Sequence, residues 1–337
     1  MGWKGTVRSI GAASRRMERE SRRRSRELER QQHQIEKMQE LERATYEVEV
    51  YENYIERLQS MHKECSETCD WGEIKLMKPP ERPNKLRMHE SEAQSALDNY
   101  KPGLRDKLLK KSEDLRQKLV NEVEYAKETD RREYQEALEQ HALNYSDWEV
   151  SIKVAEKMIR GDLKAYFDAI EQANPFEELK GVGSGIEFKM GKESIMNAIL
   201  HVNGDHVIPS EAKTLLKNGK LSVKPIPKGK FYEIYQDYVC SSVLRVAREF
   251  YALLPADMLI ITAMTDLLNT KTGHIEEQPI LSAVIPRKTL ERLNFETLDP
   301  SDSMGNFVRQ MKFKKTKRFS AIEPITPASL QLDTRVV

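Results

Sequence analysis

The sequence predicts an α+β protein in which a long antiparallel helical coiled-coil hairpin precedes a small α+β domain. Two stretches, residues 12–71 and 104–160, contain neither Gly nor Pro and therefore favour long helices. The break between them, residues 72–103, holds six of these helix breakers, so the chain is expected to turn back there. After residue 175, short strand candidates alternate irregularly with helices, which favours the α+β class.

The composition is consistent with this division. A chain of 337 residues is long enough for two domains. With 32% charged residues and a mean hydropathy of -0.67, it is too polar for one large core and is better suited to long exposed helices. The predicted boundaries are a flexible N-terminal tail at 1–13, the hairpin at 14–174 with its Pro-rich turn at 72–103, the α+β domain at 175–319 and a C-terminal tail at 320–337.

The chain is expected to be cytoplasmic and to lack a membrane span. No run approaches 18 apolar residues, the basic N-terminus has no apolar signal region, and three cysteines do not make a disulfide framework. No small-molecule ligand or cofactor motif is evident. The glycine-rich run 181–185 follows a helix and precedes a strand candidate, the reverse of a dinucleotide fingerprint, so we interpret it as a hinge.

The first long helix has two different halves. Apolar residues follow 3-4 spacing from Leu41 to Cys65, as in a coiled-coil seam. Residues 14–34 are rich in Arg and have almost nothing to bury. The cations Arg22, Arg23 and Arg24 are therefore either a solvated coiled-coil end or a basic arm for phosphate backbones or anionic lipid.

The second long helix carries the strongest periodicity in the chain. From Tyr134 to Ile170, apolar residues recur at spacings of three and four. This pattern predicts one continuous helix that ends at Asn174-Pro175. Its stretch without Gly or Pro, residues 104–160, would alone form a 57-residue helix about 85 Å long, a length typical of a rod or spacer.

The C-terminal domain is predicted element by element. The central feature is an amphipathic helix at 230–254. The expected strands are 186–190, 195–202, 206–208, 221–226, 258–264 and 279–285, the last beginning at Pro279 because Pro fits a strand at its first position. The remaining elements are a polar helix or turn at 210–218, a helix at 287–293 and a helix from 299 to 311.

A possible metal site lies near the end of the first long stretch. His62, Cys65 and Cys69 stand at i, i+3 and i+7, which places them on one face of a helix. With a fourth ligand such as His89 they could hold zinc. The alternative, which we favour, is that they continue the buried seam, because structural zinc sites usually show paired Cys and His knuckles.

Four acids at strand ends suggest a second possible site. Asp257 and Asp266 flank one apolar strand, and Glu276 and Glu277 precede the next, with Lys288 beyond it. Carboxylates beside a lysine are the groups that a magnesium-dependent nuclease uses. The second strand lacks the acid-x-Lys spacing of such nucleases, so the alternative is polar residues of a hairpin loop.

The segment HVNGDH contains His201, Asp205 and His206. Asn203-Gly204 between them predicts a tight hairpin turn. Two histidines beside a turn could bind a metal, but no third ligand is evident, so we interpret them as turn residues.

A basic run near the C-terminus contains Lys312, Lys314, Lys315, Lys317 and Arg318 without an acid. Two aromatic residues, Phe313 and Phe319, interleave with it. The aromatics could stack on bases while the cations hold phosphates. Equally, the run could be an edge strand with its lysines turned outward.

Residues 221–300 carry a resemblance to a known family. Thr272-Gly273, Pro279, Ser282, Arg287 and Asp299-Pro300 resemble the domain that accompanies Mrr-like restriction-endonuclease domains in larger bacterial proteins, and the stretch is also similar to a domain of uncharacterised bacterial coiled-coil proteins. The resemblance covers about a quarter of the chain and its motifs are not catalytic. It implies a setting in DNA defence or DNA processing and no catalytic role.

Together these observations predict a non-enzymatic interaction or scaffold protein that acts through the hairpin. The partner is expected to be another protein or a second copy, and nucleic acid is a possible further partner. A divergent metal-dependent nuclease and a nucleic-acid-binding protein that uses the basic segments are the alternatives.

Overall fold

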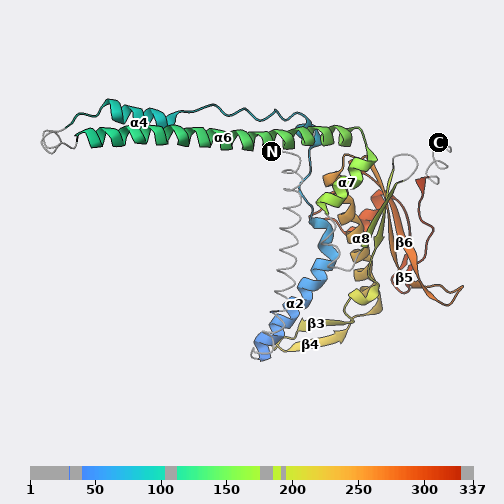
Figure 1. The fold of residues 1–337 in the computed structure, drawn as a ribbon. Helices are drawn as coiled ribbons and strands as arrows, with labels where there is room; N and C mark the ends of the chain where they lie inside the picture. Colours follow the sequence, from blue (N-terminus) through green and yellow to red (C-terminus); the bar gives the residue numbers. More distant parts are fainter. Residues whose placement is uncertain (1–29, 31–39, 103–111, 175–184, 191–194, 328–337) are drawn as a thin grey trace. The chain divides into compact units, whose positions relative to one another are not determined.

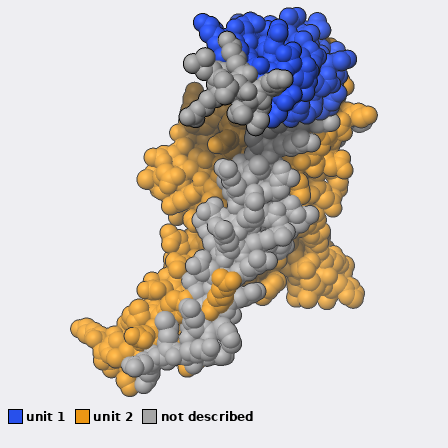
Figure 2. All heavy atoms as spheres, turned by 60° about the vertical axis from the view of Figure 1, so that its left-hand side comes forward, with its two compact units in different colours: residues 1–5, 72–155 blue, residues 6–71, 156–337 orange. Residues whose placement is uncertain are grey.

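The computed structural model describes residue 30 and residues 40–102, 112–174, 185–190 and 195–327. These residues form a mixed α+β structure with one very long helix and a mixed sheet (Figure 1). The chain divides into two compact units (Figure 2). Unit 1 contains residues 1–5 and 72–155, and unit 2 contains residues 6–71 and 156–337. The boundaries therefore group residues 40–71 with the sheet and not with the long helix.

Unit 2 contains a six-stranded sheet in the order β1-β2-β5-β6-β7-β8. Strands β2 and β5 are parallel, and the other neighbouring strands in this sheet are antiparallel. The strands are β1 Gly185–Met190, β2 Met196–His201, β5 Met258–Leu268, β6 Ile275–Pro286, β7 Val308–Lys314 and β8 Arg318–Ser320. The parallel pair requires a crossover connection, which contains a two-stranded hairpin and a long helix.

The predicted strand that starts at Pro279 is longer than expected. β6 begins at Ile275, and Pro279 sits inside it at a bulge, where Ala263 pairs with Leu281 and Met264 with Pro279. Ile280 is thus the extra residue of the bulge. A bulge is one of the few places where a strand accepts proline, because no ladder hydrogen bond is needed there.

Helix α8, Lys228–Leu253, is the core element of unit 2. It confirms the predicted helix at 230–254. Its largest fully buried side chains include Tyr238, Leu244 and Phe250. A helix that is buried on most sides must satisfy every polar group it carries, which becomes important for the site described below.

Within the described residues, the first long helix ends earlier than predicted. Helix α2 runs from Glu40 to Ser60, and the 3-10 helix η1 follows at Met61–Lys63. From Glu64 the chain is extended, up to the short helix α3, Trp71–Lys75. The expected continuous helix through residue 71 is therefore wrong, although no Gly or Pro interrupts it.

The second long helix is also interrupted. Helix α6 spans Ser112–Ile159, 48 residues or about 72 Å, and helix α7 spans Leu163–Ala173. Between them Gly161 has a φ of 75°, and the Asp162 side chain caps α7 by accepting from Ala165 N. The predicted uninterrupted helix to Asn174 is wrong because the apolar periodicity continues across a turn that breaks the helix.

In unit 1 the partner of α6 is mainly extended chain. The Trp148 indole donates to Met77 O at 2.8 Å, and His141 Nε2 lies 3.2 Å from Pro80 O. Further along, Asp130 accepts from the first turn of α4, Met88–Asp98. Segment 77–98 thus runs antiparallel to α6, and only its last 11 residues are helical. The coiled-coil hairpin is not confirmed.

Several short elements differ from the predictions. The polar segment at 210–218 contains a strand, β3 Glu211–Leu215, which pairs with β4 Leu221–Pro225. The candidate strand at 206–208 is replaced by the 3-10 helix η3, Asp205–Val207. His201 and Asp205 therefore do not flank a hairpin turn, because β2 pairs with β1 and β5 and not with β3.

The C-terminal part departs from the prediction in two places. The helix expected from 299 to 311 is only one turn, α10 Pro300–Ser303, followed by the 3-10 turn η4, Met304–Asn306. The helix expected at 287–293 is α9, Arg287–Leu290. The described part of the predicted C-terminal tail packs on the sheet, since Ile322 N donates to Pro279 O at 2.9 Å and Ile325 is buried.

Candidate functional site

The candidate site is organised by a polar row along one ridge of α8. Asp237, Ser241, Arg245 and Glu249 follow one another at intervals of four residues, so they lie on one side of the helix. All four are at least nine-tenths buried, with exposed fractions of 5%, 0%, 4% and 1%. Buried polar groups need hydrogen-bond partners, so the segment that packs on this side of α8 must supply them.

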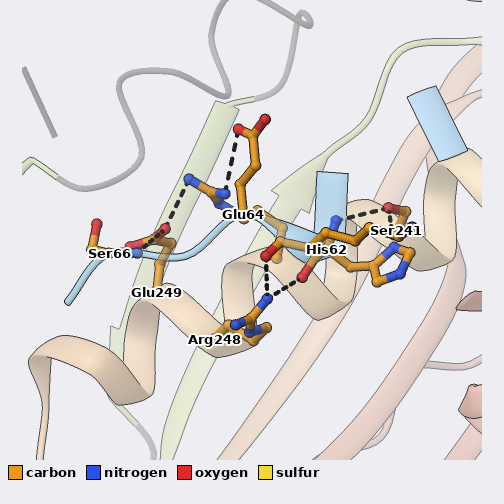
Figure 3. A network of polar contacts seen from close by, with 8 residues as sticks. His62, Glu64, Ser66, Ser241, Arg248 and Glu249 are labelled. Atoms are coloured by element: carbon orange, nitrogen blue, oxygen red, sulfur yellow. Dashed lines mark hydrogen bonds and ion pairs between the residues drawn. The ribbon is translucent and has the colours of Figure 1, made fainter. Parts of the chain in front are cut away.

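The partners come from residues 59–66, in the same order along the chain. Figure 3 shows the part of this ladder from His62 to Ser66. This segment connects the end of α2 to the extended chain. Its contacts with the row are Gln59 Nε2 to Asp237 Oδ2 at 2.6 Å, His62 N to Ser241 Oγ at 3.0 Å, Glu64 Oε2 to Arg245 Nη1 at 3.7 Å and Ser66 N to Glu249 Oε1 at 3.0 Å.

Further contacts extend this ladder toward the C-terminal end of α8. Cys69 N donates to Ala252 O, and the Trp71 indole donates to Leu253 O, both at 2.7 Å. Arg248 donates to the carbonyls of residues 62 and 63 (Figure 3). These bonds replace the intrahelical hydrogen bonds that residues 61–71 would otherwise make, which explains why α2 ends at Ser60 without a helix breaker.

A cavity of about 600 Å³ opens beside the N-terminal half of this ladder. Four parts of unit 2 line it: α2, η1, α8 and the loop that leads into α10. The lining residues are Tyr51, Glu52, Ile55, Glu56, Gln59, Ser60, His62, Lys63, Asp237, Thr297, Leu298, Asp299 and Pro300.

His62 lies at the base of this cavity and is 1% exposed. Burial, reinforced by the charges of Lys63 and Arg248, lowers the pKa of His62 to about 4, so the imidazole is neutral at pH 7. Its Nδ1 lies 2.8 Å from Ser241 Oγ, which also accepts from His62 N. The Ser241 hydroxyl can donate to Nδ1 or accept from it, so this contact is compatible with either tautomer of the neutral ring, and Nε2 has no hydrogen-bond partner among the described residues.

The pKa values of two carboxyl groups that line the cavity are shifted in opposite directions. Burial raises the pKa of Asp237, and its Oδ1 has no hydrogen-bond partner within the described chain. For Asp299, burial is outweighed by the donors Asp302 N and the Ser301 hydroxyl, which lower its pKa. The Asp299 bonds form the N-cap of α10, so this carboxylate is held in a fixed position at the mouth.

The cavity has an excess of negative charge. Four carboxylates line it, while Lys63 is its single charged base because His62 is neutral. No salt bridge within the described residues joins any of the four to a cation. The signal for this arrangement in the sequence is limited to the row of polar residues at i, i+4, i+8 and i+12 of the predicted helix.

The predicted zinc ligands are not assembled. His62 uses Nδ1 for Ser241, and Cys65 and Cys69 lie in extended chain instead of on one helical face. Burial raises the pKa values of the Cys65 and Cys69 thiols to about 11 and about 12, which disfavours the thiolate that zinc requires. The suggested fourth ligand, His89, belongs to unit 1.

A different His and carboxylate cluster occurs in unit 1. His89, Asp130 and Glu133 are the one group among the described residues whose ligand atoms lie within 4.8 Å of one another. Asp130 already accepts from His89 N and Glu90 N and so caps α4, while His89 Nε2 pairs with Glu133 at 3.3 Å. The cluster is explained by these structural contacts.

The four candidate nuclease acids are not gathered at one point. Asp257 precedes β5, whereas Asp266 lies near its other end, nine residues away or about 30 Å in an extended strand. Asp266 pairs in register with Glu277, and Glu276 accepts from Asn269 and Thr272 in the hairpin turn. Asp257 therefore cannot share a metal ion with the other three, since two-metal sites need ions about 4 Å apart.

His201 has a partner that the sequence did not indicate. Its Nδ1 contacts Glu277 Oε1, and its Nε2 lies 3.6 Å from Glu187 Oε1. The three residues come from β2, β6 and β1, so only the sheet order brings them together. His206 is not part of this group.

The basic run forms an exposed hairpin of β7 and β8. Phe313 pairs with Phe319 across the strands with ring centroids 5.1 Å apart, and Phe319 is buried against Tyr235. These aromatic rings serve packing, which supports the edge-strand interpretation and not base stacking. Lys315 pairs with Glu233 and Arg318 with Asp205, so the run is partly neutralised. Arg22, Arg23 and Arg24 lie outside the described residues.

The residues that carry the family resemblance have structural roles. Arg287 donates to the carbonyls of residues 251, 254 and 256, and its guanidinium lies 4.8 Å from the Tyr251 ring centroid. Ser282 Oγ bonds to Thr262 and accepts from Ile325 N. These contacts fasten the C-terminal end of α8 and the last described segment to the sheet.

Within the described residues, no helix has the length and apolar character needed to cross a bilayer. Comparison of the chain with models of protein families, with curated proteins and with solved structures gave no match.

Proposed function

We propose that this chain is a non-enzymatic interaction or scaffold protein whose partner binds along α6. The observation that carries this proposal is an exposed apolar face on that helix. Tyr125, Leu143 and Val150 have exposed fractions of 72%, 63% and 37%. Their spacings of 18 and 7 residues correspond to five and about two helical turns, so they share one face.

This face is opposite the one that segment 77–90 of unit 1 covers. Asp130, His141 and Trp148 hold segment 77–90, and at 100° per residue they lie roughly 140–160° around the helix from Leu143. Burying one large apolar side chain contributes about 1.5–3 kcal/mol, so the three side chains are an anchor and charged neighbours must complete the interface. A helix from a second copy or from another protein fits this surface.

Sedimentation equilibrium of the full chain and affinity capture from the native host test this proposal. Leu143→Glu with Val150→Glu should abolish self-association or remove the captured partner. Leu76→Glu is the matched control, because Leu76 is 82% exposed in the same unit. A monomer at all concentrations, together with identical captured proteins for wild type and double variant, would refute the proposal. Nuclease treatment of the capture tests the DNA setting that the family resemblance implies.

Nucleic-acid binding is the second candidate function. Lys312, Lys314 and Lys317 are exposed on the β7–β8 hairpin, and no carboxylate among the described residues pairs with them. Three phosphate contacts would give a slope of log K against log salt of about -2.7. Fluorescence anisotropy with duplex DNA measures this slope, and replacing the three lysines by Ala should remove it. The nuclease alternative gains no support from the positions of the four acids.

A further inference from the structure

We propose that the cavity beside α2 and α8 binds an organic cation that carries a guanidinium or ammonium group. The inference is independent of the function proposed for α6. It rests on two buried, unpartnered polar atoms and on unbalanced charge, all within unit 2.

The first observation concerns the two unpartnered atoms. Asp237 Oδ1 is an acceptor, His62 Nε2 donates or accepts according to the tautomer of the ring, and both residues line the cavity. A buried polar group without a partner costs free energy, so such groups in a cavity wall favour a ligand that satisfies them. The pair calls for a polar ligand with a donor for Asp237 and a second polar group for His62.

The second observation concerns charge. Glu52, Glu56, Asp237 and Asp299 surround the cavity, and Lys63 is the single cation in its lining. The ligand that this field favours is positively charged. The four carboxylates lie on α2, α8 and the N-cap of α10, and Asp299 is fixed there by two hydrogen bonds. An arginine or lysine residue, with its peptide group as the second polar group, has the required chemistry, and a volume of about 600 Å³ is ample for it.

A metal ion fits this cavity less well. The ligand atoms of its acids and His62 do not form a group within 4.8 Å of one another, unlike His89, Asp130 and Glu133. A guanidinium spreads its charge over a plane with five donors and can therefore bridge carboxylates that are too far apart for one ion.

Isothermal titration calorimetry of the full chain with acetyl-arginine amide tests the proposal. Acetyl-citrulline amide is the matched neutral ligand of nearly the same shape. Saturable binding of the arginine compound, at least tenfold tighter than that of the citrulline compound, is expected. Absence of saturable arginine binding, or equal affinity for the two compounds, would overturn the inference.

Substitutions of residues that line the cavity test whether the cation binds there. Asp237→Asn should weaken binding about 10–100-fold, because a hydrogen bond to a charged group is lost. Glu56→Gln, at an exposed rim position, should weaken it severalfold without affecting the fold. Glu171→Gln, elsewhere on unit 2, is the control and should leave affinity unchanged. Wild-type affinity in both cavity variants would show that the cation binds elsewhere and would overturn the proposal.

The cation could be a free molecule or belong to the chain's own basic segment. Replacing Arg22, Arg23 and Arg24 by Ala in the full chain distinguishes the two sources. If the added arginine compound binds more tightly to this variant, the chain's own arginines compete for the cavity. If its affinity is unchanged, the cavity serves an external cation. Both results support the proposed chemistry, which the titrations above test.

Discussion

The buried ion pair of Arg245 and Glu249 gives the sharpest test of the ladder between α8 and the chain after α2. Arg245 Nη2 lies 2.8 Å from Glu249 Oε1, with side-chain exposures of 4% and 0%. The same Oε1 accepts from Ser66 N at 3.0 Å. Glu249→Ala thus removes the carboxylate that lies 2.8 Å from the buried guanidinium, and it leaves the buried N–H of Ser66 without its acceptor.

The expected loss for Glu249→Ala is about 3–5 kcal/mol, the range for removing one partner of a buried ion pair. Replacing both members, Arg245→Met with Glu249→Leu, should recover most of this loss. About 1–3 kcal/mol should remain, because Ser66 N still lacks an acceptor. The exposed partner of Arg287, Glu291, provides the control: Glu291→Ala should cost at most about 1 kcal/mol.

Urea unfolding followed by tryptophan fluorescence measures these differences. Trp71 is 3% exposed and bonded to Leu253 O, so it reports on the ladder itself. A background with Trp3→Phe and Trp148→Phe removes the signals of the other two tryptophans and isolates unit 2 from unit 1. A loss below about 1 kcal/mol for Glu249→Ala, or a double variant as unstable as the single one, would refute the reasoning.

Three further predictions follow from single residues. Asp130→Asn should remove one of the two cap bonds of α4 and speed amide exchange in its first turn about fivefold, whereas Glu133→Gln should not. Gly161→Ala should lower thermal stability by about 1–2 kcal/mol because its φ is 75°, while Gly229→Ala, whose φ is not positive, should be near neutral. The pKa of His62 near 4 lies below its unfolded value of about 6.5, so the unfolded state binds more protons between these values. The stability that His62 contributes should be complete above pH 6.5 and decline by about 3 kcal/mol as the pH falls to 4, and NMR of its ring should show no titration above pH 5; a midpoint near 6.5 would contradict this.

The sequence correctly predicted those elements that depend on the local spacing of apolar residues. The α+β class, helix α8 and the apolar hairpin of β5 and β6 all follow from apolar periodicity and run length. Alternation of Phe313 and Phe319 with lysines left two interpretations open. The cross-strand pairing of the rings decided between them, because pairing is a property of register and not of one strand.

The errors occurred where tertiary contacts override propensity. Residues 61–71 contain no breaker, yet the polar row of α8 captures their backbone and ends α2. Likewise α6 has a regular heptad-like apolar face. Trp148 and His141 bind the extended chain at residues 77–80 on that side of the helix, where a second long helix was expected. A heptad pattern predicts that one face of a helix is buried, but it does not predict which segment of the chain buries it.

The candidate site also depends partly on local sequence patterns and partly on tertiary contacts. The sequence by itself predicted an amphipathic helix at 230–254, and the spacing of Asp237, Ser241, Arg245 and Glu249 places them on one ridge of such a helix. Only the tertiary structure decided that the chain after α2 and the cap of α10 close around that ridge and leave an acidic cavity. The physical reason is that buried polar groups must find partners, and which distant segment supplies them depends on how the chain folds back, not on any local pattern.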